Sequence, residues 1–358
     1  MARVAIILAL LLLPAAAGAQ AQDDLRAPGQ GSVLSKVSAY QDDDDTLVIT
    51  SLVDGDVVLP GRVTLGAHVL VDSISSASVD VVSAATGRWQ EDRVEAGARA
   101  AARVPGGVDA GLALARSTEN DWASWSLEGS LARDLAQKNT RVEVSYGQST
   151  NRVGRAGDPA FERALTARTV EAGVTQVAGP RTVIGAVVTV QVADGFLNSP
   201  YRYVTTADGR FALPEAHPGR RVREAVTVRV LRAVGRRAGW DTSYRLYVDD
   251  WGVVSHTLAT AIDLELAGAW DLRLRARAYR QSAADFYQET YAAPMAFMTA
   301  DRELATFWDA GGGVKLGWRR GRWVVDGKAD GTYYRYLDFA RLAGRAALVV
   351  ELGAGVSW

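Results

Sequence analysis

The sequence contains no cysteine among its 358 residues. Disulfide frameworks and thiolate metal sites are therefore excluded, and an exported chain of this size must be held together by a core or a closed sheet. An excess of charge of one sign is also lacking, because 40 Lys and Arg residues are balanced by 41 Asp and Glu residues. Without a polybasic surface, we expect no nucleic-acid partner.

Long apolar runs are missing everywhere except at the N-terminus. There, Arg3 precedes an apolar run that ends at Leu13, and small residues follow up to Ala21. This order is typical of a secretory signal peptide, so residues 1–21 are predicted to be cleaved off during export. No later segment approaches the roughly 18 apolar residues of a spanning helix, which excludes a helical membrane protein. Residues 22–34 are polar and predict a short unstructured leader in the periplasm.

Alternation of apolar and polar residues recurs along most of the remaining chain, and it is clearest at the C-terminus. There, one face carries only Ala, Leu, Val and Trp358, while the other face carries Glu351. Only a β-strand has a period of two. In a second segment, an unbroken aliphatic face is opposed by Arg273, Arg275 and Arg277. Such strands fit a barrel with one face in lipid and the other lining a wet lumen.

The connections between the predicted strands alternate in length. Tight turns are expected at 60–61, 105–107, 137–139, 179–180, 235–237, 268 and 320–321. The connections between them are usually longer, with the longest at 193–221 and 282–303. Short periplasmic turns and longer extracellular loops are the pattern of up-and-down outer-membrane barrels. Residues 35–358 therefore predict an all-β transmembrane antiparallel barrel of about 16 strands, within a range of 14–18, with its first strand at 35–41.

Tryptophans are expected at the two membrane interfaces, because the indole ring is amphipathic and outer-membrane lipid would surround the barrel. Five fall at the turn ends of predicted strands: Trp240, Trp270, Trp318, Trp323 and Trp358. Five others fall near the loop ends: Trp89, Trp122, Trp125, Trp251 and Trp308. The terminal Trp358 also resembles the aromatic end that the barrel-assembly machinery recognises in outer-membrane proteins, so that machinery is a predicted partner.

Five stretches of the chain resemble one bacterial family, catalogued as domain of unknown function 3570. They are Val37 to Asp45 (VSAYQDDDD), Leu70 to Thr86 (LVDSISSASVDVVSAAT), Tyr244 to Thr257 (YRLYVDDWGVVSHT), Gln281 to Tyr287 (QSAADFY) and Tyr334 to Val350 (YRYLDFARLAGRAALVV). The resemblance covers nearly all of the chain after the signal peptide. It implies an outer-membrane barrel and supplies no molecular function.

One candidate site is the set of charged side chains expected to line the lumen. Its principal members are Arg229, Arg245, Arg273, Arg275, Arg277, Asp263, Glu265 and Glu351, accompanied by Glu128, Glu143, Asp326 and Asp330. These groups either form cross-strand ion pairs or build a charged constriction that selects solutes.

A second candidate site is an acidic cluster expected at the outer rim. Its members are Asp42, Asp43, Asp44, Asp45, Asp72, Asp249, Asp250 and Asp285, with Asp80 and Asp338 nearby. These carboxylates either form ion pairs with Arg280, Arg335 and Arg345 that fix the loops, bind a cation such as Ca²⁺, or recognise a substrate. No other cofactor is expected, and no metal other than Ca²⁺ is indicated.

Catalytic signatures are scarce, and we expect no enzyme. The three histidines are His68, His217 and His256. Neighbouring strand residues point to opposite faces, so Ser255 and His256 are not a nucleophile and base pair. The glycines at 311–313 match a phosphate loop weakly, because no helix follows them, and close packing between strands explains them better.

The sequence favours a channel or export pore for an unidentified solute or polymer. The alternative is a non-conducting structural or adaptor barrel, whose long loops bind an envelope protein or surface polysaccharide. An outer-membrane enzyme is a third hypothesis. In each case, the location predicted by the signal peptide and the strands is the outer membrane.

Overall fold

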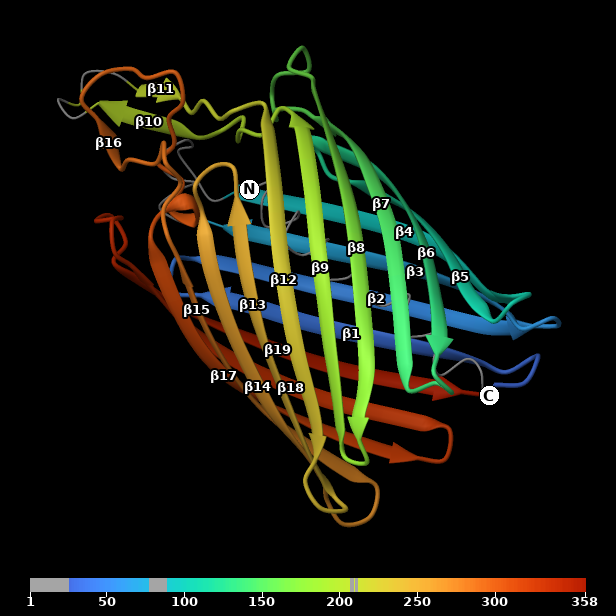
Figure 1. Cartoon of the computed structure of the whole chain (residues 1–358). Helices are drawn as coiled ribbons and strands as arrows, with labels where there is room; N and C mark the ends of the chain where they lie inside the picture. Colours follow the sequence, from blue (N-terminus) through green and yellow to red (C-terminus); the bar gives the residue numbers. More distant parts are fainter. Residues whose placement is uncertain (1–25, 77–88, 207–208, 210–211) are drawn as a thin grey trace.

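The computed structural model describes residues 26–76, 89–206, 209 and 212–358, so the predicted signal peptide and Asp80 lie outside the described residues. Within this part of the chain, sixteen strands form one closed antiparallel barrel (Figure 1). A small three-stranded sheet and one 3₁₀ turn complete the regular structure described. No helix among these residues is long and apolar enough to cross a membrane. The all-β class and the count of sixteen strands predicted from the sequence are confirmed.

Each barrel strand pairs with the strands before and after it along the chain. The first eight are β1 (Gly31–Asp42), β2 (Thr46–Leu59), β3 (Val63–Ser76), β4 (Trp89–Val104), β5 (Val108–Thr118), β6 (Trp122–Leu135), β7 (Thr140–Val153) and β8 (Arg163–Gly179). The other eight are β9 (Thr182–Gly195), β12 (Arg220–Ala233), β13 (Ala238–Asp249), β14 (Val254–Glu265), β15 (Trp270–Gln281), β17 (Phe307–Arg320), β18 (Trp323–Tyr336) and β19 (Gly344–Ser357).

The barrel is closed by antiparallel pairing of β1 with β19, over a register that runs from Ser32 opposite Ser357 to Asp42 opposite Ala347. Two further backbone hydrogen bonds extend this seam, because Gly31 N donates to Trp358 O at 3.1 Å and Trp358 N donates to Gly31 O at 3.0 Å. Closure leaves none of the sixteen described barrel strands with a free edge. This is the condition for a sheet to lie in lipid, where unpaired backbone groups are not solvated.

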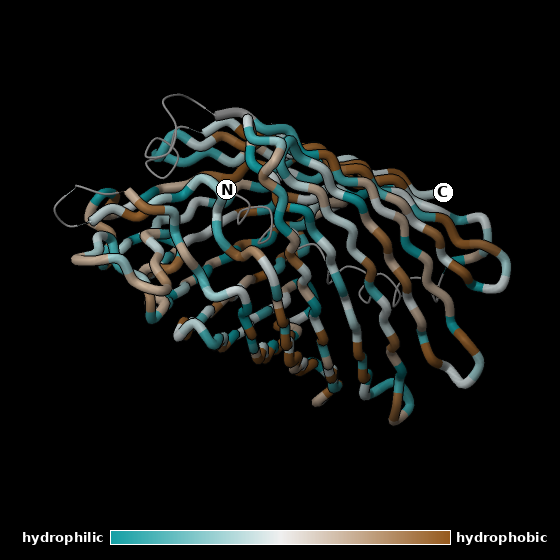
Figure 2. The backbone as a smooth tube through the Cα atoms, turned by 90° about the horizontal axis from the view of Figure 1, so that it is seen from above, coloured by the Kyte–Doolittle hydropathy of each residue, from teal (hydrophilic) through white to brown (hydrophobic). Residues whose placement is uncertain are grey.

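The alternation in the sequence separates an outer face from an inner face. On β19, Leu352 points outward and is 67% exposed, while Glu351 beside it points inward and bonds Lys36 of β1 at 2.9 Å. On β15, Leu274 is likewise exposed, whereas Arg273 reaches carboxylates on the inner face. Hydrophobic and hydrophilic positions alternate at short intervals along the strands in Figure 2. The outer face is therefore aliphatic and the inner face is charged, as predicted.

The connections also separate into two rims. Seven short turns lie at one end, here called the turn rim, at the positions predicted from the sequence. The connections at the other end, here called the loop rim, are longer in several cases, such as residues 154–162 and 337–343, although the one at Asp43 to Asp45 is short. At one turn, Gly61 and Arg62 both have positive φ angles, of 83° and 59°. A tight reversal after Pro60 requires this left-handed backbone.

Two long connections fold into a single unit at the loop rim, which we call the loop cap. It comprises the described residues of 196–219 and 282–306, and it contains β10 (Tyr203–Thr206), β11 (Ala212–Pro214), β16 (Thr290–Tyr291) and η1 (Arg302–Leu304). Strands β11, β10 and β16 form one sheet, in which β10 from the first connection pairs in parallel with β16 from the second. Figure 1 shows this sheet beyond the loop ends of the barrel strands.

The loop cap has apolar clusters of its own. Val204, Tyr291, Met298 and Ala300 are buried together within its sheet. A second cluster, around Trp251 at the β13–β14 connection, joins the cap to the barrel and includes Val253, Ala284, Tyr287, Leu304 and Ala305. The cap is therefore a packed structure and not a set of independent loops.

Two details differ from the sequence predictions. The first strand begins at Gly31, so the leader predicted over 22–34 is too long by four residues. Arg26, within that leader, already forms an ion pair with Asp56, and the hydrogen bonds from Gly31 to Trp358 explain why the strand starts early.

The predicted outer tryptophan belt is also wrong in part. Trp125 and Trp308 are exposed on the outer face, but Trp122 packs against the buried Val153 cluster. Trp251 is 3% exposed within the cap. At the turn rim, by contrast, Trp240, Trp270, Trp323 and Trp358 are all exposed, and Trp318 is in register with Trp270. Position near a strand end therefore indicates an interface residue only where no loop folds over that end.

Candidate functional site

The lumen wall over β12 to β15 is held by a branched network of ion pairs. Asp241 of β13 accepts bonds from two arginines on different strands, Arg229 at 2.6 Å and Arg273 at 2.7 Å. Arg273 also bonds Asp263 of β14 at 2.7 Å. Hydrogen bonds to charged groups are the stronger ones, and a chain of them across four strands fixes the wall.

Further ion pairs continue around the wall on β15 to β19 and β1. Arg275 bonds Asp330 of β18 at 2.7 Å, Lys315 pairs with Asp326, and Arg277 pairs with Asp309 of β17. A second group at the turn rim joins β4 to β7, through Arg103, Asp109, Asp134 and Arg141. Most arginines predicted to line the lumen are thus engaged with carboxylates on neighbouring strands.

Several inward charges have no ion pair within the part of the chain that the structure describes. Among them are Glu128, Glu143, Glu171, Arg245 and Glu265. Three of these carboxylates lie on the neighbouring strands β6, β7 and β8, and Glu171 accepts only a hydrogen bond, from Thr189. This sector of the wall therefore carries negative charge without matched cations.

Several inward side chains lie over a glycine directly opposite on the next strand. Asp330 lies over Gly313, His68 over Gly97 and Glu143 over Gly173, and in each case a Cβ on the glycine would collide with the polar side chain. Gly313 is accounted for in this way, whereas Gly311 leaves room for Thr332 and the backbone of β18, and Gly312 lies against the backbone oxygen of Arg275.

The acidic residues predicted at the outer rim do lie at the loop rim, but they are dispersed. Asp42 pairs with Arg345 and accepts the backbone N–H groups of Asp44 and Thr46. Asp72 accepts a hydrogen bond from Thr50 and lies near Arg93. No three of the predicted carboxylates come within coordination distance of one another among the described residues.

The remaining predicted carboxylates order individual loops. Asp43 accepts the backbone N–H of Ala346, and Asp45 has a left-handed backbone at the loop tip. Asp249 binds Arg221 and two backbone N–H groups of its own turn, and Asp250 accepts the N–H of Val222. The carboxylate of Asp285 lies against Gly252. Their geometry is that of turn and ion-pair partners.

Charged and polar contacts tie the loop cap to distant parts of the rim. Arg302 of η1 bonds Asp44 in the β1–β2 connection at 2.5 Å, and both side chains are 6% exposed. On the other side, the Tyr201 hydroxyl donates to Asp121 in the β5–β6 connection. Within the cap, Arg202 bonds Asp301 at 2.6 Å and so joins its two connections. These contacts fasten the cap to the β1–β2 and β5–β6 connections, in addition to its covalent links to the barrel strands.

The three histidines occupy unrelated positions. His68 lies on the lumen wall, 3.3 Å from Glu95, and His217 is buried in the cap beside Glu215. His256 points outward, with Nδ1 2.7 Å from the Tyr244 hydroxyl, while Ser255 is buried on the inner face. Ser255 and His256 therefore do not form a pair.

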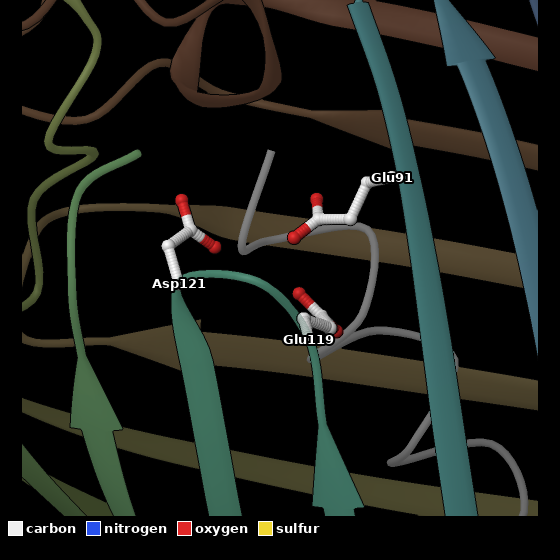
Figure 3. Close-up of side chains that lie close together, drawn as sticks. All are labelled: Glu91, Glu119 and Asp121. Carbon is white, nitrogen blue, oxygen red and sulfur yellow. The ribbon is translucent and has the colours of Figure 1, made fainter. Parts of the chain in front are cut away.

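One group of carboxylates was missed by the sequence analysis. Glu91, Glu119 and Asp121 bring their oxygens within 4.8 Å of one another at the loop rim (Figure 3). They come from β4 and from the short β5–β6 connection, and no local motif links them. The strand register alone brings these residues together, so only a correct pairing of β4 with β5 could have found them.

The comparisons with known proteins agree with the fold. The barrel is similar to CdiB from Acinetobacter baumannii (TM-score 0.54, 9% identity, 93% of this chain and 61% of that one). It is also similar to a bacterial polysaccharide outer membrane secretin (TM-score 0.51, 11% identity, 93% and 100%). The outer membrane protein OpdK from Pseudomonas aeruginosa gives a TM-score of 0.48 at 9% identity, over 92% and 99%. The chain thus spans about six tenths of the length of CdiB. No curated protein sequence matches it.

The family resemblance is borne out over a shorter range than expected. The matching family model covers residues 86–344 and so includes the stretches at 244–257 and 281–287 and most of that at 334–350. It leaves out the stretch at 37–45 and all but the last residue of that at 70–86. The chain thus has the fold of outer-membrane β-barrels, and it belongs to the family described as protein of unknown function (DUF3570).

Proposed function

We propose that the barrel is a channel or export pore for a hydrophilic solute or polymer. The observation that carries this proposal is the charge on its inner face, above all the inward groups named above that form no ion pair in the described residues. An ionised group without a counterion is stable only where water solvates it. A wall that carries such groups therefore favours a water-filled lumen over a dry core.

The carboxylates without ion pairs indicate which sign of charge the pore should favour. Glu128, Glu143 and Glu171 lie on adjacent strands, and acidic groups that line a pore attract cations. Arg245 on β13 is the unmatched group of opposite sign. We therefore expect a preference for cations, or for cationic and neutral solutes, at neutral pH.

The test is conductance of the refolded protein in a planar bilayer under a KCl gradient. Replacing Glu128, Glu143 and Glu171 by Gln should lower the permeability ratio of K⁺ to Cl⁻ several-fold, and Arg245→Gln should raise it. Glu162→Gln is a matched control, because Glu162 is exposed in the β7–β8 connection. Absence of conductance in the wild type and in a variant with a loosened loop cap would overturn the proposal.

The loop cap favours a second candidate, a non-conducting adaptor barrel. The cap has its own buried clusters, and it exposes Met295 (52%) and Phe297 (45%). Exposed apolar side chains on an ordered surface are typical of contact sites for a partner. Photo-crosslinkers at these two positions should then capture one envelope protein or polysaccharide reproducibly. Equal capture by a crosslinker at the turn rim would contradict this role. The proposal assigns no catalytic reaction to the chain.

A further inference from the structure

The three carboxylates missed by the sequence analysis lie at the inner edge of the loop rim. Glu91 is near the start of β4, and Glu119 and Asp121 flank Asn120 between β5 and β6. Figure 3 shows their carboxylate groups turned toward one another. Among the described residues, this is the only group of three acidic or histidine side chains close enough to share an ion.

The charge of this group is not balanced by protein cations. None of the three carboxylates forms an ion pair with a Lys, Arg or His of the described residues. Arg93, two residues along β4, is engaged with Glu95 at 3.0 Å and approaches Asp72 at 3.8 Å. Three negative charges this close together repel one another, most strongly at Glu91, which is the buried member. The site therefore needs protons or an added cation.

A second observation concerns Glu91 alone. Its side chain is largely buried, with 6% of the residue exposed, and its Oε1 atom has no hydrogen-bond partner among the described residues. A buried carboxylate oxygen left without a partner is destabilising, and such atoms are rare in folded proteins. In Figure 3 this carboxylate points into the space between Glu119 and Asp121. The carboxylate that contains this oxygen is thus directed at the place that a ligand would occupy.

The arrangement is also held in place by outer contacts. The Tyr201 hydroxyl donates to Asp121 Oδ2, and it accepts the Ala156 N–H at 2.6 Å. The backbone of Asp121 is fixed as well, because its carbonyl accepts the Gly154 N–H at 2.6 Å. Outer hydrogen bonds of this kind orient the carboxylates of metal sites.

We propose that Glu91, Glu119 and Asp121 bind a divalent cation, with Ca²⁺ as the preferred ion. The donor set is entirely carboxylate oxygen, which suits hard cations and disfavours zinc or copper. Ca²⁺ accepts a flexible set of about six to eight oxygen ligands, whereas Mg²⁺ requires near-ideal octahedral geometry and usually keeps several waters. A site whose carboxylates come from two separate segments of the chain therefore suits Ca²⁺ better. Bound Ca²⁺ would fasten β4 to the β5–β6 connection and, through Tyr201, to the loop cap.

The experiment is titration of the folded, full-length barrel in detergent after removal of cations with a chelator. CaCl₂ should bind at one saturable site by calorimetry and raise the thermal unfolding temperature. Glu91→Gln and Glu119→Gln should each weaken this binding at least tenfold, and the control Glu162→Gln should leave it unchanged. MgCl₂ should bind more weakly than CaCl₂.

Folding of each variant is checked by the shift of the unheated barrel on a gel, so that lost binding is not confused with lost structure. If Glu91→Gln fails to fold, Glu119→Gln and Asp121→Asn test the same site. Wild-type protein that binds no Ca²⁺, or folded variants that bind it as well as wild type, would overturn the proposal. This outcome does not depend on whether the barrel conducts.

Discussion

Asp330 on β18 lies directly over Gly313 on β17, in register, and its Oδ1 atom accepts a hydrogen bond from Arg275 of β15 at 2.7 Å. The glycine is what allows this contact between strands on either side of β17. A methyl group at position 313 would overlap the carboxylate of Asp330 and approach the backbone oxygen of Ala329 at 2.7 Å. The ion pair and the glycine therefore form one structural unit.

Gly313→Ala should destabilise the barrel by about 1–3 kcal/mol, because the added methyl group overpacks the wall and displaces Asp330 from Arg275. The measurement is urea unfolding of the protein in lipid vesicles. Gly331→Ala is the control, since no atom lies within 4 Å of a Cβ added there. Equal stability of the two variants would contradict this explanation of the glycines.

The contact between Arg302 and Asp44 predicts how the loop cap is held. Both side chains are buried, so removing Arg302 leaves a carboxylate without its charged partner, at a cost of about 3–5 kcal/mol. Arg302→Ala should therefore loosen the cap, increase proteolysis within 282–306 and raise conductance. Arg341→Ala is the control, because its pair with Glu289 is long, at 3.8 Å, and exposed. Unchanged proteolysis in Arg302→Ala would show that the cap is held by its apolar clusters alone.

The barrel was predictable because its determinants are local. Period-two alternation at Leu348, Val350 and Leu352 identifies the lipid face residue by residue, and short turns such as that at Gly61 identify one rim. These signals depend on neighbouring residues and on turn geometry, which the sequence displays directly.

The loop cap and the proposed cation site were not predictable because they depend on contacts between residues that are far apart in the sequence. The cap sheet pairs β10 with β16, about 85 residues apart in the chain, and neither segment shows strand alternation over so few residues. Trp251 was assigned to a membrane interface because nothing near it in sequence indicates the loop that buries it. Glu91 and Asp121 meet only through the β4–β5 register.

The C-terminal residue is predicted to act in assembly. Trp358 is 54% exposed at the turn rim, while its backbone hydrogen-bonds Gly31 and completes the seam between β19 and β1. Trp358→Ala keeps the backbone bonds but removes the exposed ring. We expect it to slow insertion by the barrel-assembly machinery in cells several-fold, with little effect on the stability of protein that has folded. Trp323→Ala, also exposed at the turn rim, is the control. Equal insertion rates for both variants would argue against recognition of the terminal ring.

Cation binding at the loop rim should depend on pH near neutrality. Burial, reinforced by the charges of Asp121 and Asp72 and opposed by Arg93, raises the pKa of Glu119 from 4.5 to about 7. Two other titratable groups lie at this site: the carboxylate of Glu91, and the hydroxyl of Tyr201, which hydrogen-bonds Asp121. In the absence of a cation, Glu119 of the folded protein therefore keeps its proton up to about pH 7, whereas in the unfolded chain it releases the proton near pH 4.5. Because the folded state holds this proton more tightly, Glu119 favours folding fully below about pH 4.5, and this contribution to stability is lost as the pH rises through about 7.

Ca²⁺ competes with that proton, so its affinity should rise as the pH increases from 6 to 8. Binding should release more protons at pH 6 than at pH 8, which calorimetry in buffers of different ionisation enthalpy would detect. In Glu119→Gln the weaker residual binding should depend less on pH over this interval, while Glu162→Gln should keep the wild-type profile. A wild-type affinity that is constant from pH 6 to 8 would mean that Glu119 is already ionised before the cation arrives.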